Sequence, residues 1–239
     1  MLKYFFLILP IAGFSQDAVR VEYEVRQEFE DNSEVKTEFS TNLLRNSANR
    51  IFKYELFVNS SQSNFIEIKQ IDNSQSKEHS LGLHPMIGNN YYKKIKTNEL
   101  FEQSTMDMRT LIKDTIQSFP WVLSKEESII LGYKARKATY TNNNQTVEAW
   151  YAPDLPFRDG PSRFNGLPGL ILKIKFKIPY LIVDVNNTII MNATKIDPYT
   201  GKIELPKKVN IITIDVFQED LKKKTEKQKE LRSQGVEKD

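Results

Sequence analysis

The stretch FNGLPGLILKIKF, residues 164–176, contains the corner from which the fold can be worked out. Pro168 has the backbone angle required at the second position of a type II turn, and Gly169 can adopt the positive φ required at the third. Leu167 precedes a proline and is therefore restricted to extended conformations. Gly166 carries no side chain, so we expect the backbone to approach a neighbouring segment closely there. The stretch predicts a tight corner between two extended segments.

Beyond this corner, apolar and polar residues alternate with the two-residue period of a half-buried β-strand. The strand should begin at Leu170 and direct its three lysines to solvent. Its inward residues are Leu170, Leu172, Ile174, Phe176 and Ile178, and its lysines are Lys173, Lys175 and Lys177. Residues 21–29 and 52–58 alternate in the same way. Their predicted buried residues are Val21, Tyr23, Val25, Phe29, Phe52, Tyr54, Leu56 and Val58.

Turn-forming residues separate the apolar runs at a spacing that suits about ten strands joined as a meander. No helical pattern alternates with these runs, as a parallel βαβ fold would require. We therefore predict a mainly β protein with one large twisted antiparallel sheet, or a curled half-barrel, over residues 16–213. The 14 Phe and 10 Tyr fit such a sheet because aromatic side chains pack well on a pleated surface.

The end of the chain differs from the rest. Residues 214–239 mix acidic and basic side chains and contain few apolar ones, which predicts a charged helical tail. The apolar residues Val216, Phe217, Leu221 and Leu231 are too sparse for a broad buried stripe. Two interpretations stay open: a solvated helix that docks only by its first turns, and a helix that binds a partner.

The first 15 residues, MLKYFFLILPIAGFS, combine one lysine, a short apolar run and small residues. This pattern is typical of a secretory signal peptide over residues 1–15, and the run is too short to anchor the chain across a bilayer. A buried N-terminal strand is the alternative. The chain has no Cys, which excludes lipidation at Cys and disulfides. We expect a periplasmic or secreted protein without a transmembrane segment.

The charges are nearly balanced, with 34 basic and 31 acidic residues and a formal net charge of +3. No basic block dominates the sequence. Because phosphate binding usually needs a concentrated basic patch, we expect no nucleic-acid partner.

Residue types that support catalysis or metal binding are scarce. Without Cys there is no thiol nucleophile, and no nucleophile-elbow motif accompanies the two histidines, His79 and His84. Neither their spacing nor the thioether pair Met106 and Met108 matches an established metal motif. We therefore expect no metal site and no cofactor.

Three carboxylates near the corner offer an enzymatic alternative. They are Glu148, Asp154 and Asp159, and they would suit a carboxylate-dependent hydrolase if they lined one cleft. Asp154 and Asp159 do not follow the pattern of a calcium-binding loop.

Several motifs occur in order around the corner: GYKARKAT at 132–139, AWYAPDLP at 149–156 and GPSRFNGLPGLIL at 160–172. In these motifs the chain resembles the GLPGLI family of secreted Bacteroidetes proteins. The family is named after six residues, seen here as Gly166, Leu167, Pro168, Gly169, Leu170 and Ile171. The resemblance implies export and a β-rich fold. It brings no established activity and no catalytic residues.

Two departures from the family limit what can be transferred. Ala135 stands where many members carry Cys, and NNNQ at 142–145 replaces an Arg-Gly-Arg-like turn. A thiol-dependent role in relatives therefore cannot be carried over to this chain.

Together these observations favour a non-enzymatic binding or accessory protein of the cell envelope. A curved sheet with an aromatic concave face would suit an apolar ligand, by analogy with half-barrel lipid carriers. The charged tail would instead suit a protein partner such as an outer-membrane receptor. Trp and Arg often anchor interfaces, so the candidate binding residues lie near the corner. They are Trp150, Tyr151, Arg158 and Arg163. We interpret residues 166–171 as a structural motif.

Overall fold

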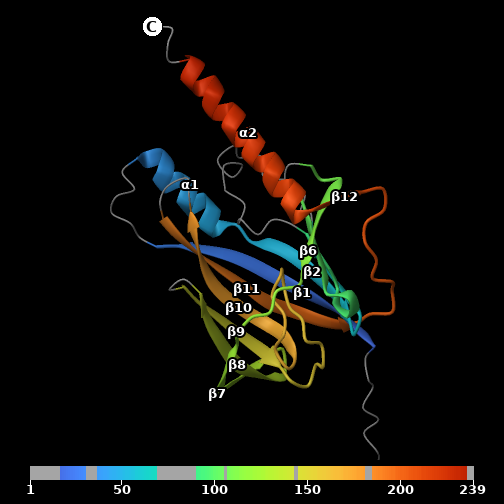
Figure 1. The fold of residues 1–239 in the computed structure, drawn as a ribbon. Helices are drawn as coiled ribbons and strands as arrows, with labels where there is room; N and C mark the ends of the chain where they lie inside the picture. Colours follow the sequence, from blue (N-terminus) through green and yellow to red (C-terminus); the bar gives the residue numbers. More distant parts are fainter. Residues whose placement is uncertain are drawn as a thin grey trace, which may run out of the picture.

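The computed structural model describes residues 17–30, 37–68, 90–104, 107–142, 145–180 and 185–235. Within these ranges, 12 strands form one sheet that is not closed into a barrel (Figure 1). The predicted leader at 1–15 and both histidines lie outside the described residues.

The sheet consists of two antiparallel meanders. The first contains β1 (Ala18–Phe29), β2 (Phe52–Asn59), β3 (Gln62–Glu67), β4 (Tyr91–Lys94), β5 (Glu99–Gln103) and β6 (Thr110–Thr115), with the 3-10 helix η2 (Ile95–Thr97) between β4 and β5. The second contains β7 (Val122–Ile130), β8 (Tyr133–Asn142), β9 (Gln145–Ala152), β10 (Leu170–Tyr180) and β11 (Val185–Pro198). Strand β11 pairs with β1 and so joins the two meanders.

The last strand, β12 (Asn210–Thr213), pairs in parallel with β6 at one edge. The strand order is β12-β6-β5-β4-β3-β2-β1-β11-β10-β9-β8-β7. The prediction of a mainly β fold with one large sheet is confirmed. The β12–β6 pair makes the sheet mixed, whereas the sequence predicts an antiparallel one.

The alternation read from the sequence corresponds to burial in the structure. In β1, Val21, Tyr23 and Val25 are at most 1% exposed, although Phe29 is only half-buried. The four predicted residues of β2 are all buried, and so are Leu170, Leu172, Ile174 and Phe176 of β10. Lys175 and Lys177 are exposed and Lys173 is half-buried. A period of two therefore identified the buried face of each of these strands.

The connection between the meanders shows that the sheet is curled. Strand β6 is second in the order and β7 is twelfth, so in a flat sheet they would lie ten spacings, or about 48 Å, apart. Residues 116–121 join them, and the seven steps from Thr115 to Val122 reach at most about 25 Å. The sheet must therefore bend until its two ends approach each other.

The β9–β10 loop, residues 153–169, fills the inside of this curl. Its apolar side chains are buried in one cluster with residues from both meanders. The loop residues in the cluster are Leu155, Phe157, Phe164 and Leu167. The concave face is thus packed by the loop, which ends in the Gly-Leu-Pro-Gly corner.

The corner is tighter than the sequence predicts. In a type II turn the Leu170 N–H would bond to the Leu167 carbonyl. Instead, the Gly169 N–H donates to the Leu167 carbonyl over 2.8 Å, and the Leu170 N–H donates to the Leu155 carbonyl over 3.0 Å. The predicted type II turn is therefore wrong, and the chain makes a three-residue turn around Pro168. The prediction that a strand begins at Leu170 is confirmed.

Both corner glycines have positive φ, 91° at Gly166 and 151° at Gly169. The close backbone approach expected at Gly166 occurs at Gly169. A Cβ added to Gly169 would lie 2.2 Å from the Ala152 carbonyl oxygen, whereas one added to Gly166 would lie 3.9 Å from the Trp121 ring nitrogen. Gly169 is therefore required both by its conformation and by the space available.

A buried ion pair attaches the loop to β4. The Lys93 ammonium donates to the Asp159 carboxylate over 2.5 Å, and both side chains are at most 2% exposed. The same ammonium also donates to the carbonyls of Phe164 (3.0 Å) and Gly160 (3.3 Å). Burial lowers the pKa of Lys93, and Asp159 partly offsets this effect. One cation thus bonds three points of the loop.

Two α-helices accompany the sheet in the described ranges. The C-terminal helix is confirmed as α2 (Ile214–Gly235). The other, α1 (Glu38–Asn49), lies against β1 and was not predicted. Its described buried side chains include Leu43 and Ser47, and the Ser47 hydroxyl donates to the Leu43 carbonyl over 2.6 Å. Polar residues make up most of its sequence, EFSTNLLRNSAN, and they obscure the helix when the sequence is read alone.

Replacing Gly169 by Ala should reduce the free energy of unfolding by at least about 3 kcal/mol, because the strain of a positive φ adds to a clash with the Ala152 carbonyl. Gly132 is the matched control, because it has a φ of 82° and nothing within 4 Å of an added Cβ. Gly132→Ala should cost only about 1 kcal/mol. Urea unfolding of both variants measures the difference. Equal losses would contradict the steric role of Gly169.

Replacing Lys93 by Met should destabilise the protein by about 3–5 kcal/mol, because the Asp159 carboxylate is then buried without its cation. The double variant Lys93→Met/Asp159→Asn carries no buried charge and should recover at least half of that loss. Thermal and urea unfolding of both variants test this coupling. A double variant as unstable as Lys93→Met alone would show that the pair does not act as a unit.

Candidate functional site

The residues predicted to bind a partner do not form one surface. Tyr151 is 2% exposed and belongs to the core. Trp150 alternates with Tyr151 along β9 and therefore lies on the opposite, outer face of the sheet. Its ring N–H donates to Glu148 over 3.2 Å, and the Lys137 ammonium lies 5.9 Å from the ring centroid.

The two arginines of the loop contact the protein itself. Arg163 donates to Glu102 over 2.6 Å and lies 5.8 Å from the ring centroid of Tyr91, so it ties the loop to β4 and β5. Arg158 is exposed, and one of its nitrogens donates to the Gly166 carbonyl over 3.0 Å. Both side chains have a structural role that the sequence did not reveal.

The three carboxylates of the hydrolase alternative lie in different environments. Glu148 is on the outer face, where it pairs with Lys137 at 3.0 Å. Asp159 is buried against Lys93, and Asp154 is exposed in the loop. The structure does not bring the three together in one cleft.

The electrostatics of Glu148 also do not suit a general acid. Burial acts to raise its pKa, but hydrogen bonds from Lys137 and Trp150 outweigh burial and lower it. A carboxylic acid that donates a proton near neutral pH needs a raised pKa. Glu148 is instead an ionised partner of Lys137.

Aromatic residues on the inside of the curl pack against one another. Phe119, in the connection between β6 and β7, lies 5.5 Å from Phe164 and 5.3 Å from Tyr140 between ring centroids. Trp121 meets Tyr140 edge-on at 4.9 Å and donates its ring N–H to the Asn165 carbonyl over 2.8 Å. These aromatic residues close the curl over the loop.

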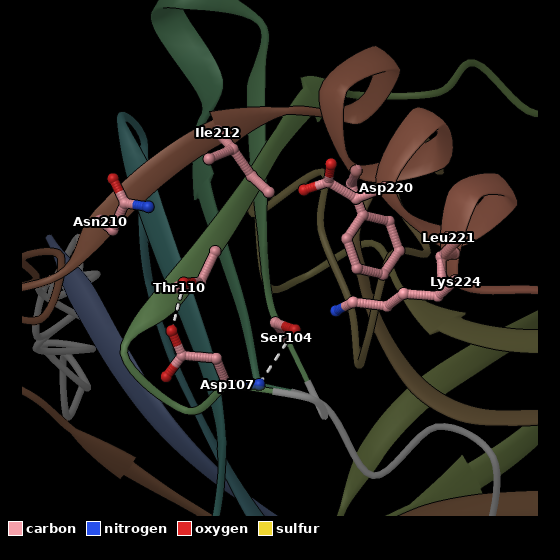
Figure 2. A pocket seen from close by; sticks show the side chains of 9 residues that line it. Ser104, Asp107, Thr110, Asn210, Ile212, Asp220, Leu221 and Lys224 are labelled. Atoms are coloured by element: carbon pink, nitrogen blue, oxygen red, sulfur yellow. Dashed lines mark hydrogen bonds between the residues drawn. The ribbon is translucent and has the colours of Figure 1, made fainter. Parts of the chain in front are cut away.

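A polar hollow lies between α2 and the strands β6 and β12, with a volume of about 220 Å³ (Figure 2). The strands and the β5–β6 turn contribute Ser104, Asp107, Thr110, Asn210 and Ile212. The helix contributes Phe217, Asp220, Leu221 and Lys224. These residues are far apart in the sequence, so no local motif could have identified the hollow.

Asp107 stabilises the β5–β6 turn at one side of the hollow. Its carboxylate accepts a hydrogen bond from the Thr110 hydroxyl over 2.6 Å and another from the Arg109 N–H over 3.0 Å (Figure 2 shows the first). These bonds lower the pKa of Asp107. The carboxylate is therefore an ionised part of the turn, and the hollow suits polar contacts of a partner better than acid–base chemistry.

The metal candidates of the sequence receive no support from the described residues. Among those residues, no group of three or more His, Cys, Asp or Glu side chains gathers where an ion could be held. Met108 is 56% exposed, while Met106 lies outside the described ranges. Within the same ranges, no helix has the length and apolarity needed to span a membrane.

Residues 140–173 match the model of a family described as a protein of unknown function, Porph_ging. This match covers β9 and the Gly-Leu-Pro-Gly corner, where the sequence resembles the GLPGLI family. No match was found among curated proteins.

Two crystal structures of PNGF-II resemble the fold. The one in space group P21 has a TM-score of 0.55 at 16% identity, and the similarity covers 85% of this chain and 32% of PNGF-II. The one in space group C2 has a TM-score of 0.52 at 19% identity, and it covers 82% of this chain and 30% of PNGF-II. The chain thus spans about a third of the length of PNGF-II. At these identities the likeness concerns the fold alone.

Proposed function

We propose that the chain is a non-enzymatic accessory protein of the cell envelope, and that it binds another protein through helix α2. The observation that carries this proposal is the position of α2, which projects away from the sheet (Figure 1). Its 22 residues correspond to a length of about 33 Å.

Helix α2 contacts the body of the protein mainly through its first turns. Phe217 is half-buried beside the polar hollow, whereas every residue from Gln218 to Glu230 is exposed. The Glu219–Lys223 ion pair at 2.7 Å supplies weak local support. A helix that is polar on all sides is stabilised by little besides such pairs, unless it bridges to another molecule. A protein partner along α2 would provide that missing contact.

The packing of the curl favours a protein partner over an apolar ligand. A carrier would need its concave face free, but the loop at 153–169 and the aromatic residues of the β6–β7 connection occupy that face. The outside of the molecule, with its mixed charges, is where binding would take place.

A similar fold occurs within PNGF-II. There the same fold makes up about a third of a longer chain, so it occurs as one part of a larger protein. In the present chain, we propose that the corresponding association is made with a separate partner. The mixed charges of α2 would recognise complementary charges, and the binding should weaken as salt is added.

We further propose that this takes place in the periplasm or outside the cell, after removal of residues 1–15. The lysine, apolar run and small residues of this segment support the proposal. N-terminal sequencing of the protein purified from its native cell should then begin at Gln16. Recovery of Met1 from the cytosol would contradict export.

Deleting residues 222–239 should abolish binding to the partner and leave the fold intact, because the described residues removed make few contacts with the sheet. The melting temperature should change by no more than about 2 °C. Proteins captured from envelope extract by the full mature chain and by the truncated chain would be compared by quantitative mass spectrometry.

Phe57→Ala is the matched control, because it alters an aromatic side chain on the outer face of β2, is not a candidate binding residue and leaves α2 complete. This variant should capture the same proteins as the unaltered chain. Equal capture by the truncated chain would contradict the role of α2. If an apolar molecule co-purifies with all three chains, the carrier function is favoured instead.

A further inference from the structure

The strand β7 ends the sheet on the side opposite to β12. It pairs with β8 along one edge, and among the described strands none pairs with its other edge. An open edge presents unpaired backbone N–H and C=O groups, which are a template for another strand. At nine residues, β7 is long enough for extensive pairing.

The side chains of β7 are unusually apolar for an exposed edge. Ile129 is 70% exposed, Val122 is 67% exposed and Leu123 is 54% exposed. Leu131, in the turn that follows, is 43% exposed. Exposed apolar side chains thus lie at both ends of β7, on either side of its polar centre, and a partner strand along this edge would cover both groups.

The sequence of β7, VLSKEESII, is complementary to itself when it is read in the opposite direction. In an antiparallel pair of two copies centred on Glu126, Val122 faces Ile130 and Leu123 faces Ile129. Ser124 then faces Ser128, and Lys125 faces Glu127. Each apolar side chain therefore faces an apolar one, each serine faces a serine and each lysine faces a glutamate. A shift of one residue would place Leu123 opposite Ser128 and lose this match.

We infer that β7 is the interface of a two-fold symmetric dimer, in which β7 of one protomer pairs antiparallel with β7 of a second copy about Glu126. The two sheets then become continuous across the dimer axis. Such an interface uses the same patch on both copies, so the assembly closes at two.

The charges already present on β7 and β8 allow this arrangement. The two Glu126 carboxylates meet near the axis, but each contacts Lys137 of its own protomer at 3.2 Å. Glu127 contacts Lys134 at 2.8 Å, and Lys125 of the second copy would approach it from the other side. Lys137 also pairs with Glu148 at 3.0 Å, so repulsion at the axis is partly offset within each protomer.

A bulge divides β7 into two regular parts. Between Leu123 and Glu127 the register with β8 shifts, and Glu126 lies within the shifted segment. Bulges often protect edge strands from unwanted pairing. The centre of the complementary sequence coincides with this bulge, where the Glu126 N–H donates to the Ser124 hydroxyl oxygen of its own chain over 3.0 Å, so the pairing of the two copies depends on the segments on either side of it. Figure 1 shows β7 at the end of the molecule away from α2, so the proposed dimer leaves the α2 helix of each protomer free.

The absence of Cys from the chain allows a direct test. In the full chain, Glu126→Cys places one thiol of each protomer opposite the other, at a Cα separation of about 5 Å that a disulfide can bridge. Ser128→Cys is the matched control, because its two thiols would be about 13 Å apart along the strands. Under mild oxidation at low protein concentration, Glu126→Cys should form covalent dimers on the order of ten times faster than Ser128→Cys. Equal rates would overturn the proposal.

Light scattering after gel filtration provides the second measurement. The unaltered chain should have twice the monomer mass, and Ile129→Lys should reduce that mass to the monomer. Ile211→Lys is its control, because Ile211 is 48% exposed on β12 at the other edge. This variant should stay dimeric. A monomeric unaltered chain, a dimeric Ile129→Lys or an assembly larger than two would overturn the proposal. If Ile129→Lys does not fold, the cross-linking rates decide.

Discussion

Residues 116–121 join two strands that lie near opposite ends of a 12-stranded sheet, and most of the architecture depends on this constraint. The connection is too short for a flat sheet, so the sheet curls and creates an interior. The interior must be filled, because an empty apolar space loses dispersion contacts. The loop at 153–169 fills it, and the Lys93–Asp159 pair holds the loop in position. The Gly169 corner then returns the chain to the sheet at Leu170 in the narrow space beside Ala152.

Because the interior is filled, the surfaces that we propose for binding lie at the two ends of the sheet. The concave face supports the fold, and the loop arginines bond to Glu102 and to the Gly166 carbonyl. At one end of the sheet, β12 leads directly into α2, which projects with little support. At the other end, no strand of the described residues pairs with the outer edge of β7, and Val122, Leu123 and Ile129 are exposed there. A packed centre with exposed elements at both ends of the sheet is consistent with the assembly with other proteins that we propose.

The polar hollow could not be predicted from the sequence, because its lining residues come from segments far apart in the chain. Residue type predicts Trp150, Arg158 and Arg163 as interface anchors, but type does not show whether a side chain also bonds within its own chain. The hydrolase carboxylates were close in sequence, yet Glu148 and Asp159 ended on opposite sides of the sheet. Lys93 was missed because its pattern, YYKK, resembles an ordinary half-exposed strand. Only its distant partner Asp159 explains its burial.

The sequence by itself determined the strand faces, the start of β10 at Leu170 and the charged C-terminal helix. These features depend on local periodicity and composition, which act within one element. The tertiary structure decided the strand order, the parallel β12–β6 pair, the curl and the close approach at Gly169. It also decided which polar residues are buried and which edge is left open. These features depend on contacts between residues that are far apart in the chain. Neither the hydrophobic period nor the residue type shows which distant residues come into contact.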